Sequence, residues 1–300
     1  MTTKARDAAA RARLSLEGLS VGDAFGETNI ARTPPTMLRV HQRLLAARRP
    51  WLWTDDTAMA LSVVDVLRAR GTIDEADLAA RLAARYREEP LRGYGSGAHR
   101  ILTEIGQGVP WRQAAGAAFG GQGSAGNGGG MRSAPIGAWF AGDLDRAAAE
   151  AARSAAPTHA HVDGTAGAIA IAVAAAAVFG GAREPGTILA AIIDRTPAGH
   201  VRDRLPLIER LGDDRHQAAE FLGNGSQVLA ADTVPFAIWC ALQFLADYDA
   251  ALWCCCDVGG DVDTTCAMVG GIVVGAVGVD AIPVLWRAAR EPLPPSSTRT

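Results

Sequence analysis

Apolar residues recur with helical spacing along most of the chain. Positions i, i+3 and i+4 are apolar in seven segments, at residues 9–25, 58–67, 75–86, 98–105, 144–155, 234–245 and 281–289. Two further runs, 166–182 and 266–279, are apolar throughout and rich in Gly and Ala. No comparable period-2 pattern of a strand accompanies them. The pattern therefore predicts an all-α protein.

The two apolar runs are candidates for the centre of the protein. Both fall short of the roughly 20 residues that a membrane-spanning helix needs, so we expect buried core helices and no membrane segment. Breakers rich in Gly and Pro separate the helical segments at 32–35, 92–97, 120–130 and 180–186. We find no internal repeat and no dividing linker. We expect one compact, single-domain orthogonal helical bundle over residues 1–290, followed by a disordered tail over 291–300.

Composition narrows the range of partners. The 300 residues are 49% hydrophobic and 20% charged, as in a globular chain with a large core. A formal net charge of −3 gives no general basic footprint for nucleic acid. The five cysteines, three of them consecutive, lack paired C-x-x-C spacing, so we expect reduced thiols. Residues 1–14 contain no apolar run of a secretory signal, and we expect a cytoplasmic monomer.

Two short acidic segments carry the main chemical signal. Residues 54–57 read Thr-Asp-Asp-Thr, and residues 259–265 read Gly-Gly-Asp-Val-Asp-Thr-Thr. Each precedes an apolar helical stretch, so either could simply cap a helix, since Thr and Asp are common N-caps. An apolar helix needs only one cap, however, and the second segment offers two carboxylates. If the fold brings the four carboxylates together, they repel one another unless cations neutralise them.

Two glycine-containing segments add to this signal. Residues 126–137 form a glycine-rich stretch ahead of an apolar helix, where free backbone N–H groups would suit a diphosphate; a flexible surface loop is the alternative. The G-x-G-x-x-G sequence at 121–126 has no flanking strand, so we reject a dinucleotide-binding Rossmann fold. Within 18–26, glycines interrupt a helical pattern at a cost of about 1 kcal/mol each against alanine. Close helix packing or a nearby ligand should compensate.

Taken in order, these segments resemble the ADP-ribosylglycohydrolase family, which includes dinitrogenase-reductase-activating glycohydrolases and ADP-ribosyl-acceptor hydrolases. The matching motifs are Gly-Asp-Ala-x-Gly at 22–26, Thr-Asp-Asp-Thr at 54–57, Gly-Asn-Gly-x-x-Met-Arg-x-x-Pro at 126–135, Thr-His at 158–159 and Gly-Asp-x-Asp-Thr at 260–264. They span nearly the whole chain. Their shared order is more specific than any single motif.

The resemblance implies an all-α fold with a cleft that holds two Mg²⁺ or Mn²⁺ ions. The implied metal ligands are Thr54, Asp55, Asp56, Asp261, Asp263 and Thr264. Oxygen ligands of this kind suit these cations better than Zn²⁺.

The resemblance also implies a substrate-binding set. It consists of Gly126, Asn127, Gly128, Gly129, Gly130, Met131 and Arg132, which would hold the diphosphate, with His159 nearby and the cleft segment Tyr94, Gly95, Ser96 and Gly97. His159 could equally be a structural hydrogen-bonding residue. Tyr94 could stack on a base or belong to the core.

The implied reaction is hydrolysis of the glycosidic bond at C1″ of an ADP-ribosyl group, with release of ADP-ribose. A metal-activated water attacks, a carboxylate completes its deprotonation, and the acidic surroundings stabilise positive charge on the ribose. Asp56 and Asp261 are the first candidates for the base, with Asp55 beside them. Better-known members carry a glutamate further beyond the Gly-Asp helix, whereas Glu27 here follows Gly26 directly. Either Glu27 fills a gating or base role through a different loop shape, or that role is vacant.

Two other classes of function stay open. One is a catalytically silent ADP-ribose-binding or structural protein, because the family includes a jellyfish lens crystallin; the intact ligand clusters disfavour it. The other is a magnesium-dependent nucleotide phosphohydrolase, which the ordered full-length resemblance disfavours. We expect an ADP-ribosylated protein, nucleic acid or small molecule as substrate. The irregular rim segments 27–35 and 88–97 do not reveal which acceptor group carries the ADP-ribose.

Overall fold

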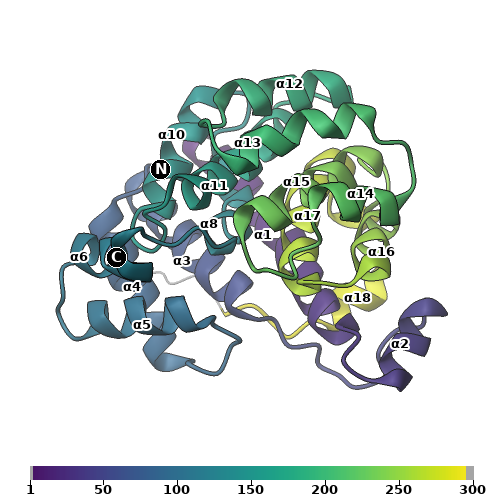
Figure 1. Cartoon of the computed structure of the whole chain (residues 1–300), viewed down its shortest axis with the longest axis horizontal. Helices are drawn as coiled ribbons and strands as arrows, with labels where there is room; N and C mark the ends of the chain where they lie inside the picture. The colour runs from purple at the N-terminus through teal and green to yellow at the C-terminus, as the bar shows by residue number, and fades with distance from the viewer. Residues whose placement is uncertain (1–2, 295–300) are drawn as a thin grey trace.

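The computed structural model describes residues 3–294, which form an all-α protein (Figure 1). Its helices are α1 Thr3–Asn29, α2 Pro34–His41, α3 Asp55–Arg70, α4 Glu75–Glu88, α5 Ser96–Gly106, α6 Trp111–Gly116, α7 Ala118–Gly121, α8 Gly128–Met131, α9 Ala134–Trp139, α10 Leu144–Ala155, α11 Val162–Phe179, α12 Pro185–Arg195, α13 His200–Arg204, η1 Leu205–Arg210, α14 Arg215–Leu222, α15 Ala230–Gln243, α16 Tyr248–Val258, α17 Val262–Val277, η2 Val279–Ala281 and α18 Val284–Ala289. Extended pairing within the described residues is limited to two isolated bridges, Trp51 with Arg290 and Gly126 with Leu229. The predicted all-α fold is confirmed.

Helices α1 and α17 pack along each other at the centre of the protein, through three glycines of α1 spaced four residues apart. A Cβ atom added at Gly18 would lie 2.4 Å from the carbonyl oxygen of Gly270, and one added at Gly22 would lie 2.2 Å from that of Cys266. A Cβ atom at Gly26 would lie 2.5 Å from the Cα of Asp263. Close helix packing therefore compensates for the glycines.

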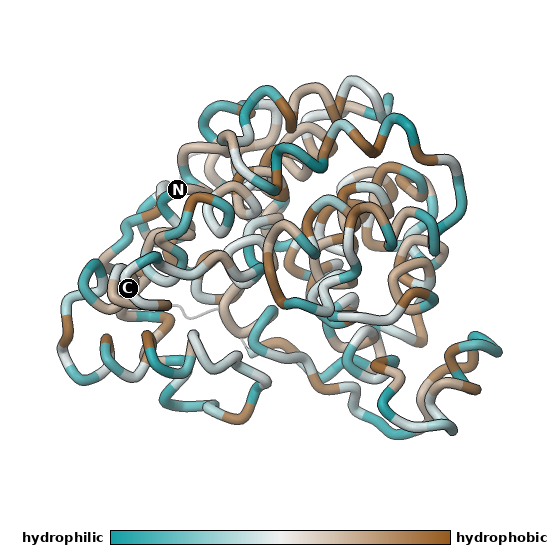
Figure 2. The backbone as a smooth tube through the Cα atoms, viewed as in Figure 1, coloured by the Kyte–Doolittle hydropathy of each residue, from teal (hydrophilic) through white to brown (hydrophobic). Residues whose placement is uncertain are grey.

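Helix α11 completes the centre by packing against α9, α10, α12, α15 and α17. It is long and apolar enough to cross a membrane, but 83% of its 18 residues are buried inside the protein. The apolar run predicted at 166–182 therefore belongs to a buried core helix. Peripheral helices bury one face only, and Figure 2 shows hydrophobic and hydrophilic residues alternating along them. In α4, for example, the buried residues are Leu78, Ala79, Leu82 and Ala83.

The predicted helical segments fall within or largely overlap α1, α3, α4, α5, α10, α11, α15, α17 and α18. The breaker predicted at 32–35 does separate two helices, since α1 ends at Asn29; Thr33 then caps α2, and Pro34 and Pro35 form its first turn. Proline is tolerated there because the first N–H groups of a helix have no intrahelical partner. Helix α12 begins in the same way at Pro185, after the capping residue Glu184. The sequence pattern did not predict helix α16.

The predicted disordered tail is wrong at its start. The main-chain N–H of Glu291 donates to the carbonyl oxygen of Trp51 at 2.8 Å, and the Glu291 carboxylate pairs with Arg92. Residues 295–300 of that prediction lie outside the described residues. The chain is therefore held in place beyond the predicted boundary at 290.

Replacing Gly22 by alanine should test the central packing. The new methyl group would overlap the α17 backbone, and overpacking of this kind costs about 1–3 kcal/mol or more. We expect Gly22→Ala to lower the free energy of unfolding in urea by at least about 2 kcal/mol. Gly106→Ala is the control, because nothing lies within 4 Å of its added Cβ atom. Equal stability of the two variants would contradict a glycine-dependent α1–α17 contact.

Candidate active site

The two acidic segments lie at the N-termini of α3 and α17, where the positive ends of helix dipoles favour carboxylates. Thr54 and Asp261 hold the N-cap positions, yet neither side chain makes a capping hydrogen bond. True caps occur elsewhere in the chain, at Asp74, Asp143 and Asp247. Helix capping therefore does not explain the side chains of the two segments.

The side chain of Thr54 instead faces two carboxylates. Its hydroxyl is 2.8 Å from Asp23 Oδ1 and 3.0 Å from Asp56 Oδ2. The hydroxyl of Thr264 lies 3.4 Å from the same Asp56 oxygen, which links the segment at α17 to the segment at α3. The fold thus brings together the two acidic segments that the sequence singled out.

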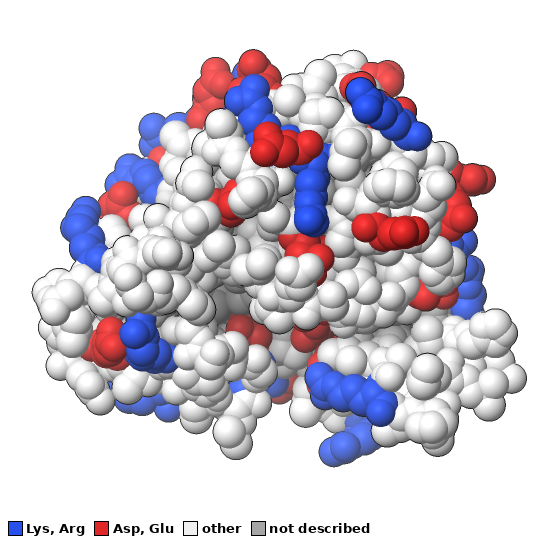
Figure 3. Space-filling model, viewed as in Figure 1, with Lys and Arg blue, Asp and Glu red and all other residues white. Residues whose placement is uncertain are grey.

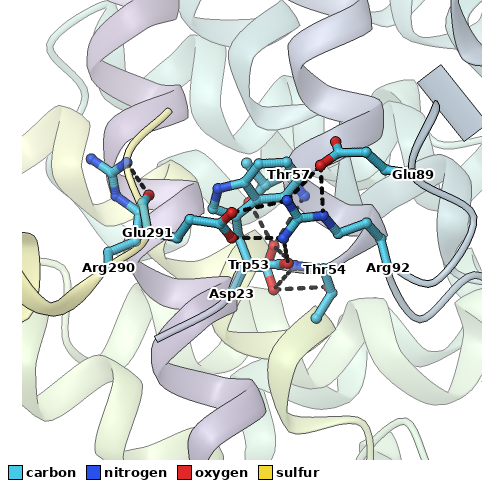
Figure 4. Close-up of polar contacts among 8 residues, drawn as sticks. All are labelled: Asp23, Trp53, Thr54, Thr57, Glu89, Arg92, Arg290 and Glu291. Atoms are coloured by element: carbon cyan, nitrogen blue, oxygen red, sulfur yellow. Dashed lines mark hydrogen bonds and ion pairs between the residues drawn. The ribbon is translucent and has the colours of Figure 1, made fainter. Parts of the chain in front are cut away.

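Asp23 is a residue of this site that the sequence reasoning did not select. Its carboxylate is fully buried on α1 and accepts the main-chain N–H of Thr54 at 2.9 Å and of Thr57 at 3.0 Å. It also accepts both threonine hydroxyls, at 2.8 and 2.5 Å (Figure 4). The sequence placed Asp23 in the Gly-Asp-Ala-x-Gly motif at 22–26 but gave it no role. Asp23 fixes the turn at 54–57 against α1.

Burial and mutual repulsion dominate the electrostatics of the site. Burial, followed by the charge of Asp263, raises the pKa of Asp55 well above its ordinary value, and burial with the charge of Asp23 does the same for Asp56. Burial raises the pKa of Asp23 and that of Asp261 to about 7 each, with the charge of Asp263 adding to both. Figure 3 shows acidic side chains within a central recess of the molecular face. The site thus crowds acidic groups away from water, where their neutral forms are favoured unless a cation binds.

The donor atoms fit a hard divalent cation. Asp56 Oδ1 and Asp263 Oδ1 are buried and have no hydrogen-bond partner, which is costly for carboxylate oxygens unless another group neutralises them. Hydroxyl and carboxylate oxygens are the donors that Mg²⁺ and Mn²⁺ prefer. Within residues 3–294, no three His, Cys, Asp or Glu side chains converge closely enough to enclose an ion. The chemistry of the donors, rather than a closed coordination sphere, supports a metal site.

The glycine-rich stretch is tied to the second acidic segment through Asn127. The Asn127 amide donates to Asp261 Oδ2 at 2.6 Å and to Thr233 Oγ1 at 3.0 Å. Its main-chain N–H donates to the carbonyl oxygen of Val228, and those of Gly130 and Met131 donate back to the Asn127 carbonyl oxygen. The stretch is therefore a short helical turn, α8, with most N–H groups engaged, rather than the predicted open loop.

Arg132 does not face the cleft in this structure. Its guanidinium is fully buried and donates to the carbonyl oxygens of Gly128 and Ser154 and to the hydroxyl of Thr158, at 2.6 to 3.1 Å. Burial lowers its pKa to about 10. The prediction that Arg132 binds the diphosphate is wrong for this arrangement, because its donors hold the fold together. Gly129, Gly130 and Met131, which belong to the turn itself, are likewise buried.

His159 lies against the exposed part of the same turn. A Cβ atom added at Gly126 or Gly128 would lie 3.5 or 3.2 Å from its Nε2 atom. Its Nδ1 atom shares a hydrogen bond of 2.7 Å with the hydroxyl of Thr158. Burial, followed by the charge of Arg132, lowers the pKa of His159 to about 3. A neutral imidazole thus borders Gly126 and Gly128, the half-buried members of the predicted set.

The segment 94–97 divides into a buried and an exposed part. The Tyr94 ring packs edge-on against Tyr86 at 5.1 Å and is 5% exposed, so it belongs to the core and does not present a face for stacking on a base. Gly95 and Ser96 are exposed, and Gly97 is half-buried beside the Phe119 ring. This segment lies next to the first acidic segment, because the Asp55 N–H donates to the carbonyl oxygen of Arg92 at 2.7 Å.

Glu27 lies at the edge of the acidic site. Burial, followed by the charge of Asp263, raises its pKa, whereas Arg32, 3.6 Å away, lowers it. The glutamate directly after Gly26 is therefore within electrostatic range of the second acidic segment. Its position is compatible with the predicted gating or base role.

A second feature that the sequence reasoning missed is the segment 224–229. It lies between the glycine-rich turn and the N-terminus of α17 and forms hydrogen bonds with both. The carbonyl oxygen of Asn224 accepts the N–H of Asp261 at 3.1 Å, and a Cβ atom at Gly225 would lie 2.5 Å from the Asp261 Cβ. Val228 adopts a left-handed φ of 58°, which is rare for a β-branched residue. The Gly-Asn-Gly sequence at 223–225 was the available signal.

An all-α fold that joins two acidic helix N-termini beside a glycine-rich turn is the arrangement expected of a hydrolase with an acidic active site. A model of the ADP-ribosylglycohydrolase family matches residues 4–297, and the chain belongs to this family. The predicted resemblance is confirmed.

Individual relatives agree with the family. The ADP-ribosylhydrolase ARH3 of Danio rerio is 31% identical over 94% of this chain and 86% of its own length. The human ADP-ribosylhydrolase ARH3 is 31% identical over 80% of this chain and 74% of its own. The ADP-ribosylarginine hydrolase Tri1 of Pseudomonas putida (strain GB-1) is 26% identical over 92% and 73%. These relationships support the assignment of the chain as a hydrolase that removes ADP-ribose.

A solved structure agrees with the fold. A chain described as an ADP-ribosylglycohydrolase-related protein complex superposes with a TM-score of 0.67 at 24% identity, covering 95% of this chain and 94% of that chain. The likeness extends over the whole helical domain.

The raised pKa values predict a pH-dependent stability. Because the pKa values of Asp23 and Asp261 rise from 3.8 to about 7 on folding, the folded protein binds more protons than the unfolded chain between those values. Their stabilising contribution is present below pH 3.8 and is lost as the pH rises through about 7. We expect the melting temperature in a chelator to fall between pH 5 and 8. The fall should be smaller in Asp261→Asn, and an equal slope would contradict the electrostatic account.

Proposed function

We propose that the protein hydrolyses the glycosidic bond at C1″ of ADP-ribosylated substrates and releases ADP-ribose. One observation carries the proposal. The acidic segments at the N-termini of α3 and α17 contact each other through Thr264 and Asp56, and the N-cap side chains Thr54 and Asp261 do not cap their helices. Family membership, together with the names of its relatives, supports ADP-ribose as the group removed. The two clusters would hold two divalent cations, Mg²⁺ or Mn²⁺, through Thr54, Asp55, Asp56, Asp261, Asp263 and Thr264.

The protein side chains have separate roles in this proposal. Such cations, when bound, supply Lewis-acid activation of the attacking water. Asp56 or Asp261 would accept a proton from the attacking water, because the hydroxyl of Thr264 and the amide of Asn127 hold these two carboxylates in the site. The remaining carboxylates stabilise the positive charge that develops on the ribose. Glu27 borders the same space and is a further candidate for proton transfer.

Substrate binding uses a smaller set of residues than the sequence predicted. Gly126 and Gly128 allow a ligand to approach the neutral imidazole of His159 closely, since neither carries a side chain. Asn127 orients Asp261 through its 2.6 Å hydrogen bond. Gly95, Ser96 and Gly97 would line the cleft just after Gly93, whose added Cβ atom would lie 3.6 Å from Asp55 Oδ1. The substrate would be an ADP-ribosylated protein, nucleic acid or small molecule.

The direct test uses Mg²⁺ and a panel of arginine-, serine- and nucleobase-linked ADP-ribose, with product analysis. A glycohydrolase releases intact ADP-ribose, a phosphohydrolase releases AMP, and a binding protein releases neither. The panel also identifies the acceptor group.

Two substitutions should abolish the reaction. Asp55→Asn and Asp263→Asn each remove a charged metal ligand, so we expect at least about a hundredfold loss of ADP-ribose release at saturating Mg²⁺. Asp213→Asn is the control, because Asp213 is exposed and lies outside the site. Undiminished turnover in either ligand variant would exclude the binuclear assignment.

Cation binding should also be visible without substrate. Mg²⁺ neutralises the clustered carboxylates, so it should raise the melting temperature, and more at pH 8 than at pH 5, where protons neutralise them instead. We expect Asp263→Asn to weaken this response. An equal response at both pH values would indicate that the cation binds elsewhere.

A further inference from the structure

The segment that leads into the first acidic turn is paired with residues close to the far end of the described chain. The N–H of Trp51 donates to the carbonyl oxygen of Ala289 at 2.7 Å, and the N–H of Glu291 donates to the carbonyl oxygen of Trp51 at 2.8 Å. These bonds form the parallel bridge between Trp51 and Arg290. They bring the Glu291 side chain to within reach of residues 53–55.

Arg92, in the connection between α4 and α5, contacts both sides of Thr54. Its guanidinium donates to the carbonyl oxygen of Trp53 at 3.1 Å and lies 3.6 Å from the centre of the Trp53 ring. Its own carbonyl oxygen accepts the N–H of Asp55 at 2.7 Å. One residue therefore holds the main chain before and after Thr54, while Asp23 accepts the N–H of Thr54 itself (Figure 4).

Glu291 determines the orientation of that guanidinium. Its two carboxylate oxygens accept from Nη1 and Nη2 of Arg92 at 2.6 and 2.9 Å, a bidentate pair. Glu89 accepts from Nη2 and Nε at 2.6 and 3.2 Å. The side chain of Arg92 is 16% exposed, that of Glu291 23% and that of Glu89 36%. A partly buried bidentate pair is stronger and more directional than an exposed one, so Glu291 contributes the main constraint.

We propose that Arg92 and Glu291 are positioning residues of the first acidic segment, which connect the pairing of residues 289–291 to the geometry of Thr54 and Asp55. Neither residue belongs to the proposed metal ligands or substrate-binding set. Residues that orient metal ligands typically change metal affinity or activity by about 10–100-fold when they are substituted. The expected change in metal affinity rests on the proposed function, whereas the expected loosening of the turn at 54–57 does not.

The test compares the full-length protein with Glu291→Gln and with a matched control. Glutamine keeps the size of the side chain and removes its charge, so the bidentate pair with Arg92 is lost. Glu75→Gln is the control, because the Glu75 side chain is similarly exposed, 27%, and its ion pair with Arg153 joins α4 to α10. Arg92→Lys is the second variant, since lysine retains the charge but cannot form the planar bidentate contact. Arg92→Lys tests the positioning role if the Glu291→Gln variant does not fold.

Two readouts separate the inference from the proposed function. In the presence of a chelator, hydrogen exchange measured by mass spectrometry over residues 53–57 should be at least about tenfold faster in Glu291→Gln, because the Asp55 N–H loses a fixed acceptor. Titration with Mn²⁺, followed by electron paramagnetic resonance, should give a dissociation constant about tenfold higher than that of the wild type. Glu75→Gln should change neither quantity.

The outcomes point to different conclusions. Unchanged exchange in Glu291→Gln and Arg92→Lys overturns the positioning role. Faster exchange with unchanged Mn²⁺ affinity overturns the link to the metal ligands. A wild type that binds no Mn²⁺ overturns the proposed metal centre, while the exchange measurement still decides whether Glu291 holds the turn.

Discussion

The close contact between α1 and α17 is the constraint on which the rest of the structure depends. Three glycines allow the two backbones to approach so closely that a single methyl group at Gly22 would overlap the carbonyl oxygen of Cys266. The same contact sets Gly26 against Asp263 and places Asp23 beneath the turn at 54–57. Helix packing and the acidic site are therefore one arrangement, since a shift of α17 along α1 would separate the two acidic segments.

Grouping buried carboxylates is energetically unfavourable, and hydrogen bonds from the surrounding elements hold them in place. Buried carboxylates repel each other and lose hydration, yet each is supported from a different element. Asp23 accepts four donors from Thr54 and Thr57, Asp261 accepts the amide of Asn127, and Asp56 faces two threonine hydroxyls. Hydrogen bonds to the charged forms offset part of the repulsion, and bound cations would offset the rest.

Sequence alone predicted the helices and the acidic segments, because both depend on local patterns. Apolar periodicity identified α1, α4 and α10, and the continuous apolar run at 266–279 identified α17. The Thr-Asp-Asp-Thr and Gly-Asp-x-Asp-Thr motifs identified residues that the fold brings together. The roles of single residues depended on long-range packing that no local pattern contains. Arg132 and Tyr94 looked like ligand contacts but are buried. Asp23, Arg92 and Glu291 act through contacts with residues distant in sequence, so they were missed.

The site residues lie far apart in the sequence, so the active site should form late in folding. Thr264 meets Asp56 across 208 positions, and Arg92 meets Glu291 across 199. Closing such long loops is slow compared with forming helices. Partly folded chains therefore contain helices before they contain the site, and their carboxylate pairs remain apart and hydrated. The proposed hydrolysis would therefore require the finished fold, and a misfolded or nascent chain would be silent toward ADP-ribosylated molecules in its surroundings.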